Sequence, residues 1–583
     1  MSPALPTTTN KDRERARQTP ADRWFPWLLF GIISLMLFYR LGGPALFEPD
    51  EGRNAEKARE ILLLNDWITP HGNFHAVLDK PIFFYWLIAL SYKLFGVTEW
   101  AARLPSALAA FSCALLVYFF VRRRWGEWEA RWSVLTLVTS VEFFIFSRIV
   151  IFDMTLTAFI TLALWAFYQA ADESEPTAGW ATCATLYLAL GAATLTKGLV
   201  GLVVPGMIFF FYVLLTNRWR VLGRIRLLPG AVLFLLVVAP WYILAETHNP
   251  GYLRYYIWEE HFGRFATTEY DRFNPWYFYL YVVPIGLLPW TFLLPATVQN
   301  YWQRKLDDRT LFLTLWAFLP ILFFSLSKAK LPHYILPSFP ALAILIGVAV
   351  PRAMRESQDR LWRFGFTAGW VVLSSLFIYS VAGVIRPEIF AKIVRGRFDS
   401  ITILFWASAA VCLALVYLTS KRALWTKLNP RYFLLSQVVG LSMFVITVAE
   451  MMVLVAPARS AKEVAAKALP FLSPTTQMVS YDTYDEGLPF YLKTEKPVWV
   501  VTHSNKKSTF LGNFYAITGQ PEPISPLGKG LLTFEEFRDI WQSSGTPMVI
   551  LVKEKNLHKL ERLVGAVPKR VAAYDEYLIV TRP

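Results

Sequence analysis

The stretch from Phe47 to Pro105 reads FEPDEGRNAEKAREILLLNDWITPHGNFHAVLDKPIFFYWLIALSYKLFGVTEWAARLP, and it carries most of the chemical information in this chain. It begins as a polar loop directly after a first apolar segment, 24–40. Ionisable side chains beside a bilayer core are costly to bury and are therefore functional by default. A carboxylate at Asp50 and a cation at Lys80 in one such loop indicate transfer of a group from a phosphate-bearing donor.

The composition predicts a membrane protein. The chain has 583 residues, of which 55% are hydrophobic and 16% aromatic, and its mean hydropathy is +0.38. Apolar stretches of about 17–25 residues recur between short polar loops, which is typical of a polytopic α-helical membrane protein. The net charge of +15 comes largely from these short loops, as membrane orientation requires. We therefore expect no nucleic-acid partner.

Hydropathy predicts about 13 membrane spans. The candidate spans are 24–40, 101–121, 129–147, 152–170, 179–195, 198–216, 227–245, 276–298, 311–327, 333–349, 364–384, 402–419 and 432–455. Arg122, Arg123 and Arg124 should lie on the cytoplasmic side, as should the N-terminal basic cluster. The short apolar helix 81–95 then cannot span, and its Tyr and Trp content is typical of an interfacial helix.

This topology divides the chain into three parts. Residues 1–23 form a cytoplasmic tail, and 24–456 form a transmembrane domain whose first periplasmic loop is 41–100. Residues 457–583 form a periplasmic α/β domain, in which apolar runs at 478–481, 498–501, 547–552 and 577–580 alternate with helical stretches at 459–469, 533–542 and 556–563. This alternation predicts a small domain with a largely parallel sheet. The three cysteines all fall in apolar spans, so no disulfide framework is indicated.

Several charged residues fall on the predicted outer face, where Lys and Arg should be rare. They are Arg148 and Asp153 in SRIVIFDMTLT, Lys197 in TLTKGLVG, Glu259, Glu260, His261 and Arg264 in IWEEHFGRF, and Lys328 and Lys330, with Tyr334 nearby, in SKAKLPHYILP. A phosphate-headed lipid explains these exceptions, since its anion lies at headgroup depth, where cations reach it.

Two of the loop residues have competing interpretations. Asp50 is our candidate for the catalytic carboxylate, which would act as a base or orient the acceptor; alternatively, it caps the helix that begins near Glu51. Lys80 precedes Pro81 at a helix start and could hold an anion there, or it could be an interfacial lysine that reaches for water. Glu51 is better explained as a first-turn residue that favours the helix dipole, and Arg53 is either structural or in contact with the acceptor.

Other polar residues also allow two interpretations. Asp79 and His261 form a possible oxygen and nitrogen pair for a metal ion, although a hydrogen-bonded histidine is as good an explanation. Asp153 lies one residue into an apolar span, so it should pair with a cation such as Arg148 or Lys197. The pair is either structural or part of the electrostatics of the donor site.

Six segments together resemble a known class of enzyme. The runs PDEGRNAEKAREI, DKPIFFYWLIAL and GVTEWAARLPSALAA look like those of membrane glycosyltransferases of the GT-C architecture that use a lipid-phosphate-linked sugar. This group includes the protein O-mannosyltransferases. The runs TKGLVGLVVPG, RYYIWEEHFGRF and LSKAKLPHYILPSFPALAIL are similar to the branch of bacterial aminoarabinose transferases that act on lipid A.

The resemblance implies roles for individual residues. Asp50 matches the loop carboxylate of the family and Asp153 its second carboxylate, so both are candidate catalytic residues. Lys80 and Tyr334 match residues near the donor phosphate, and Arg264 and Lys197 are further candidates for binding it. Glu51, Arg53, Arg148 and Lys330 are expected near the site, in contact with the acceptor or in structural roles.

The resemblance also raises the question of a cofactor. Relatives usually have Glu where this chain has Asp79, and that Glu, with the His matching His261, can hold a metal ion. Aspartate is one methylene shorter, so a divalent metal such as zinc or magnesium is an open candidate here.

The expected activity is transfer of a sugar, with aminoarabinose as one candidate, from a polyprenyl-phosphate donor. The donor is expected to be undecaprenyl-phosphate-linked, and the acceptor to be lipid A or another lipid or glycan of the envelope. The reaction would occur at the periplasmic face of a bacterial inner membrane, among membrane lipids, by direct displacement with inversion. The alternatives are a transporter or flippase of lipid-linked sugars, and an enzyme that glycosylates proteins in the manner of the O-mannosyltransferases.

Overall fold

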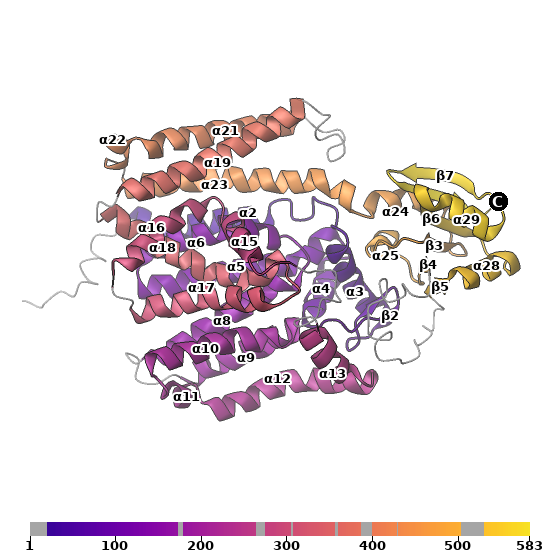
Figure 1. The fold of residues 1–583 in the computed structure, drawn as a ribbon, viewed down its shortest axis with the longest axis horizontal. Helices are drawn as coiled ribbons and strands as arrows, with labels where there is room; N and C mark the ends of the chain where they lie inside the picture. The colour runs from indigo at the N-terminus through magenta and orange to yellow at the C-terminus, as the bar shows by residue number, and fades with distance from the viewer. Residues whose placement is uncertain are drawn as a thin grey trace, which may run out of the picture.

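The computed structural model describes residues 20–172, 179–263, 274–304, 307–355, 359–385, 399–427, 429–502 and 530–582. Most of the predicted cytoplasmic tail, 1–23, and the predicted site residue Arg264 lie outside these ranges. Within them, a bundle of long helices occupies one end of the molecule and a small mixed domain the other, with a compact loop region between them (Figure 1).

The helices of the bundle coincide with the predicted spans. They are α2 (Pro20–Phe38), α5 (Glu99–Arg124), α6 (Glu127–Thr139), α7 (Val141–Phe146), α8 (Phe152–Ala171), α9 (Trp180–Lys197), α10 (Val200–Thr216), α12 (Leu227–His248), α15 (Phe278–Gly286), α16 (Leu294–Trp302), α17 (Asp308–Leu326), α18 (Phe339–Arg355), α19 (Asp359–Ile385), α21 (Asp399–Ser420) and α23 (Pro430–Val455). By length and composition, eight described helices could cross a membrane, or nine if one bent pair counts as a single span. The protein is thus a polytopic helical membrane protein.

Two predicted spans are broken rather than straight. The segment predicted at 276–298 is α15 followed by the short helix η2 (Trp290–Leu293) and α16, and its two halves meet at 103°. The segment predicted at 129–147 is divided into α6 and α7, because Ser140 adopts an extended conformation with ψ of 129°. Neither break is visible in hydropathy, since both halves are apolar.

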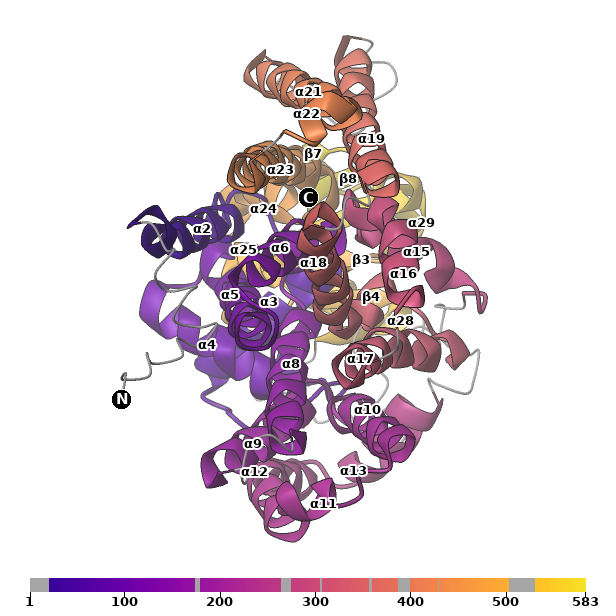
Figure 2. The same cartoon turned by 90° about the vertical axis from the view of Figure 1, so that its left-hand side faces the viewer.

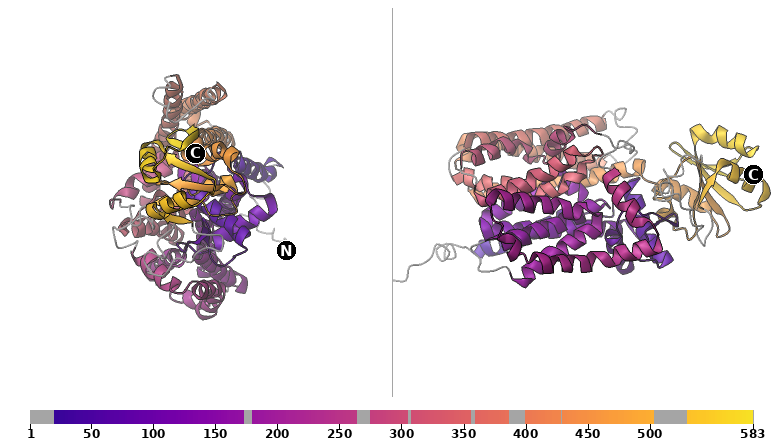
Figure 3. Two further views of the ribbon diagram at one scale, coloured as in Figure 1. Left: turned by 90° about the vertical axis from the view of Figure 1, so that its right-hand side faces the viewer. Right: turned by 60° about the horizontal axis from the view of Figure 1, so that its bottom comes forward.

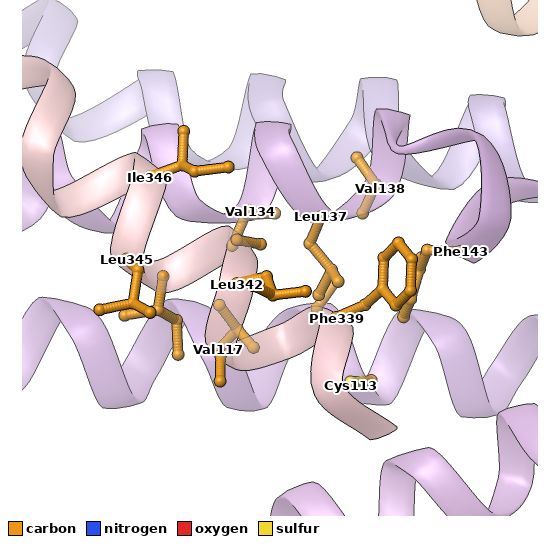
Figure 4. Close-up of a cluster of buried hydrophobic side chains, with 14 of the residues drawn as sticks. Cys113, Val117, Val134, Leu137, Val138, Phe143, Phe339, Leu342, Leu345 and Ile346 are labelled. Carbon is orange, nitrogen blue, oxygen red and sulfur yellow. The ribbon is translucent and has the colours of Figure 1, made fainter. Parts of the chain in front are cut away.

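The centre of the bundle is formed by α5, α6, α8 and α18. Viewed along its length, α19 and α21 lie to one side of this centre and α9 and α12 to the other (Figure 2). Cys113 and Val117 of α5 pack against Val134 and Leu137 of α6 and against Leu342 of α18 (Figure 4). This dry core places the ends of α8, α9 and α17 around a common cavity.

The loop region after α2 contains α3 (Asp50–Leu64), the short strands β1 (His71–Gly72) and β2 (His75–Ala76), and α4 (Phe83–Phe95). Helix α3 has two acidic residues in its first turn, which favour its dipole, and it ends at Asn65 in a left-handed conformation with φ of 50°. Helix α4 has 13 residues, which is about 20 Å and too short to cross a bilayer. Its Leu90 and Leu94 are 52% and 66% exposed, as an interfacial helix requires.

The C-terminal domain contains a six-stranded mixed sheet in its described part. The strand order is β5 (Leu531–Thr533), β4 (Trp499–Thr502), β3 (Gln477–Tyr481), β6 (Met548–Lys553), β8 (Tyr577–Thr581) and β7 (Lys569–Tyr574). Val479 of β3 pairs with Trp499 on one side and with Ile550 on the other, both in parallel. Strand β8 is antiparallel to both of its neighbours, so the sheet is less uniformly parallel than the sequence suggested.

In the described part of this domain, four α-helices accompany the sheet: α24 (Lys462–Ala468), α25 (Leu488–Leu492), α28 (Phe534–Ser543) and α29 (Leu557–Val564). The first, third and fourth coincide with the predicted helical stretches. The domain stands beyond one end of the bundle (Figure 3), and α25 packs against α3 of the loop region.

Candidate functional site

A cavity of about 530 Å³ lies where the loop region meets the ends of the membrane helices. Its polar lining includes Asp50, Arg53, Asn54, Asp79, Lys80, Asp153, Lys197, Tyr256, Glu260, His261, His333 and Tyr334. Its apolar lining includes Phe323 and Phe324 of α17 and Val200 and Val203 of α10. A cavity with charged groups on one part of its wall and aliphatic and aromatic groups on another fits a ligand with an anionic head and an apolar tail.

Asp50 is the first residue of α3. The cap position before it is held by Pro49, so the alternative in which Asp50 caps this helix does not apply. The carboxylate side chain is 49% exposed, and its Oδ1 lies 3.9 Å from Nη1 of Arg53. Asp50 is therefore accessible to an acceptor that arrives from the aqueous side, and it faces a cation that can hold it in place.

Arg53 is fixed from its other side by the C-terminal domain. Its Nε donates to Oε2 of Glu486 and its Nη2 donates to Oε1, each over 2.6 Å. Burial alone would lower the pKa of Arg53, but the Glu486 carboxylate, with help from Asp79 and Asp50, raises it above its usual value. Arg53 thus remains a cation at the cavity wall.

Lys80 and Asp79 belong to a second charged group. Lys57 Nζ donates to Asp79 Oδ1 over 3.0 Å, and Lys80 Nζ donates to the Asp79 carbonyl over 2.6 Å. Lys80 Nζ also lies 3.4 Å from Glu260 Oε2, and Tyr255 donates to the other oxygen of that carboxylate over 2.9 Å. Lys80 is therefore a cation on the cavity wall. Its contact with Glu260 is long, so an anionic ligand can replace Glu260 as its partner.

Asp153 anchors a third group. It is 2% exposed and forms a short ion pair with Lys197 at the end of α9. Its other oxygen lies 3.7 Å from Nε2 of His333, and the Lys197 ammonium lies 4.5 Å from the centre of the Tyr334 ring. The predicted pairing of Asp153 is thus with Lys197 and not with Arg148. The Asp153 carboxylate thus partly neutralises Lys197, which is one of the four residues predicted to bind the donor phosphate.

The geometry of Asp79 and His261 does not fit a metal site. The backbone N–H of Leu199 donates to His261 Nε2 over 3.1 Å, so the proton of the neutral ring is on Nδ1, which lies 2.7 Å from the Tyr256 carbonyl. Both ring nitrogens are therefore used, while Asp79 pairs with Lys57. No cluster of three or more histidine, cysteine or acidic side chains suited to a metal exists among the described residues.

Three predicted site residues are buried and do not line the cavity. Glu51 is 1% exposed and forms a bidentate ion pair with Arg103, at 2.8 Å and 2.7 Å. Arg148 donates to the carbonyls of Met36 and Leu37 at the end of α2, over 3.2 Å and 3.0 Å.

Lys330 is 3% exposed and donates to the carbonyls of Asn274 and Ser327. Backbone carbonyls hold Lys330 and Arg148, and Arg103 holds Glu51, so all three side chains stabilise the fold.

Sequence reasoning did not select four polar residues that line the cavity: Asn54, Tyr256, Ser327 and His333. Each lies within a few residues of one that was selected. Sequence reasoning named Glu260 as a charged residue of the predicted outer face but gave it no role of its own. Asn54 donates to the Val150 carbonyl over 2.8 Å and so fixes α3 to the start of α8. The helical spacing from Asp50 to Asn54 could have identified it, since residues four apart share a face of a helix.

Comparison with known proteins identifies the fold. A crystal structure of ArnT from Cupriavidus metallidurans bound to undecaprenyl phosphate superposes with a TM-score of 0.78 at 24% identity, over 96% of this chain and 98% of that one. The structure of the same protein in the apo state gives a TM-score of 0.74. Residues 79–244 also match the family model of dolichyl-phosphate-mannose-protein mannosyltransferases. The resemblance to lipid-phosphate-dependent glycosyltransferases is thereby confirmed.

Curated relatives are similar over part of their length. An undecaprenyl phosphate-alpha-4-amino-4-deoxy-L-arabinose arabinosyl transferase of Pseudomonas fluorescens is 35% identical over 347 residues, which are 58% of this chain and 62% of the relative. The enzyme of the same name from Pseudomonas aeruginosa is 34% identical over 332 residues, which are 56% of this chain and 59% of the relative. The chain thus matches about three fifths of the length of these relatives.

Proposed function

We propose that this protein transfers a sugar from an undecaprenyl-phosphate-linked donor to an acceptor at the periplasmic face of the bacterial inner membrane. The observation that carries the proposal is the cavity in which Asp50, Lys80 and an apolar wall at Phe323 and Phe324 come together. A lipid phosphate requires a cation at headgroup depth and an apolar surface for its tail. The similarity to arabinosyl transferases favours 4-amino-4-deoxy-L-arabinose as the sugar and lipid A as the acceptor.

The proposed reaction is a direct displacement. An oxygen of the acceptor attacks the anomeric carbon, the bond from that carbon to the phosphate oxygen breaks, and the lipid phosphate leaves with the electron pair. Attack from the side opposite the leaving group inverts the anomeric carbon. Lys80 stabilises the negative charge that develops on the departing phosphate, and Tyr334 lines the same cavity.

Asp50 acts on the acceptor in this scheme. Its exposed carboxylate lies on the part of the cavity wall formed by α3, next to the cation Arg53. With a hydroxyl acceptor, Asp50 takes the proton as the oxygen attacks. With a phosphate acceptor, which is already anionic at neutral pH, it orients the acceptor, and Arg53 supplies the charge that attracts it.

The function is tested with purified protein in nanodiscs that contain an undecaprenyl-phosphate-linked aminopentose. Transfer is followed by mass spectrometry of added lipid A. We expect wild-type protein to convert lipid A to a product heavier by one sugar, and Asp50→Asn to lower the rate by about 10²–10⁴-fold. Movement of the donor between leaflets without any transfer would identify a flippase instead, and an Asn variant with wild-type turnover would remove Asp50 from the mechanism.

A further inference from the structure

The C-terminal domain contacts the helix that carries Asp50. Besides the Arg53 pair, Arg59 of α3 donates to the Thr494 carbonyl over 2.8 Å. The Leu46 N–H just before α3 donates to the Tyr491 hydroxyl over 2.7 Å. The sequence separation in the Arg53–Glu486 pair is 433 residues, so only the folded chain brings these groups together.

The backbone of α3 and that of the C-terminal domain approach each other very closely at one point. A Cβ atom on Gly52 would lie 2.7 Å from both N and Cα of Gly487. The Gly487 N–H donates to Glu48 Oε1 over 2.9 Å. Because Gly487 follows Glu486 directly, this backbone contact sets where the Glu486 carboxylate stands relative to α3.

The Glu486 carboxylate therefore determines where the Arg53 guanidinium lies. It accepts from Nε and Nη2, which leaves Nη1 directed at Asp50 Oδ1, 3.9 Å away. The side chains of Arg53 and Glu486 are 25% and 21% exposed, so water screens the pair only partly. Arg53 and Asp50 both line the cavity, whereas Glu486 does not.

We propose that Glu486 is a positioning residue that holds the Arg53 cation beside Asp50, so that the C-terminal domain completes the active site. The inference deepens the proposed function and rests on it. A planar guanidinium held by hydrogen bonds at two of its nitrogens has little rotational freedom. Loss of the Glu486 charge frees Arg53 to turn fully to Asp50 or to water. The Asp50 carboxylate is then still present but is no longer held in the same position.

The first test is Glu486→Gln in the nanodisc transfer assay. Glutamine keeps the size of the side chain and one acceptor oxygen but loses the charge. We expect kcat to fall by about 10- to 100-fold, while affinity for undecaprenyl phosphate, measured by direct binding, stays within about twofold because Lys80 is untouched. The matched control is Lys462→Ala, which removes another contact between the C-terminal domain and the bundle, the 2.7 Å pair with Glu99, and should leave kcat unchanged. A Glu486→Gln protein with wild-type kcat overturns the proposal.

Thermal unfolding separates positioning from simple attachment of the domain. If Glu486 only attaches the domain, Glu486→Gln lowers kcat only as far as it destabilises the protein, as Lys462→Ala would. We expect Glu486→Gln to lower kcat at an assay temperature well below its melting temperature, where Lys462→Ala keeps the wild-type kcat. A wild-type kcat for Glu486→Gln under those conditions would overturn the proposal.

Failure of the positioning role of Glu486 can be distinguished from failure of the proposed function. If wild-type protein transfers no sugar under any condition, the proposed function fails before any variant is compared. If wild-type protein transfers sugar and Glu486→Gln does so equally well, the function stands and only the positioning role is lost.

Discussion

At the scale of single residues, Asp50 and Glu51 are adjacent carboxylates that the fold directs to different tasks. Asp50 is half exposed at the cavity, whereas Glu51 is buried against Arg103. Glu51 also accepts from the N–H of Phe47 over 2.9 Å and from that of Val150 over 2.9 Å. A buried carboxylate with this many donors fixes the loop backbone, so its neighbour can be presented in a defined orientation.

Lys80 provides the first test at this scale. We expect Lys80→Ala to weaken binding of undecaprenyl phosphate by about 10- to 100-fold, which corresponds to about 1.5–3 kcal/mol for a charge-assisted contact. The physical reason is twofold: a cation is lost, and Glu260, which lies 3.4 Å from Lys80, is left facing the phosphate. Binding to purified protein in nanodiscs measures the effect.

The control for this prediction is Lys421→Ala. Lys421 is exposed and precedes α22 (Arg422–Trp425), which lies at the end of the bundle away from the C-terminal domain (Figure 1). Its loss should leave binding unchanged. Equal losses in both variants would mean that the phosphate is held elsewhere.

At the scale of elements, the junction between α3 and α25 contains a group of carboxyls. Burial, and then the nearby charges of Asp485 and Glu486, raise the pKa of Glu48 well above its ordinary value of 4.5. Burial likewise raises the pKa of Asp485. The folded protein therefore keeps a proton on Glu48 at pH values where the unfolded chain has released it.

The sign of the pH dependence follows from this difference. Between the ordinary pKa and the raised one, the folded state binds more protons than the unfolded state, so the free energy of unfolding falls as pH rises. The contribution of Glu48 is fully present below about pH 4.5 and is lost as pH rises through the raised pKa.

We therefore expect Glu48→Gln, which mimics the protonated carboxyl in shape and charge, to be equal to wild type near pH 4.5 and more stable at pH 8. Thermal unfolding in detergent, followed by intrinsic fluorescence from pH 4.5 to 9, measures the difference between the two proteins. A difference that is constant with pH would show that Glu48 ionises normally in the folded protein.

At the scale of the whole molecule, the structure shows which parts of the chain must lie on the same side of the membrane. The side-chain amide of Asn73 in the first loop donates to the Val498 carbonyl and accepts from the Val498 N–H, both over 2.8 Å. The first loop and the C-terminal domain must therefore lie on the same side of the membrane, and a label in one reports the side of both.

The corresponding experiment uses single cysteines in a background from which the buried Cys113, Cys183 and Cys412 have been removed. Val567 is 75% exposed in the C-terminal domain, and Lys421 lies at the opposite end of the bundle. A thiol reagent that cannot cross membranes should label Val567→Cys in intact spheroplasts and Lys421→Cys only after the membrane is opened. The reverse pattern would place the cavity on the cytoplasmic side.

The sequence by itself determined where the helices lie and which loop brings Asp50 and Lys80 to the cavity. Apolar runs of membrane-spanning length and the basic loops between them are local signals, because the bilayer imposes its thickness on each span separately. Local sequence patterns also identified Asp50, Lys80, Asp153 and Tyr334, each of which lines the cavity. It also predicted α4 as a short helix that does not span.

Only the tertiary structure decided which charged residues are structural. Glu51, Arg148 and Lys330 have the same residue types and neighbourhoods as the cavity residues. What sets them apart is burial against partners that only the folded chain supplies, such as Arg103 for Glu51 and the Met36 carbonyl for Arg148. The Glu486 contact with Arg53 and the break between α15 and α16 also depend on packing between distant segments. Pairing of distant residues is set by the shape of the whole fold and leaves no local pattern, which is why the contact of the C-terminal domain with Arg53 could not be predicted from the sequence.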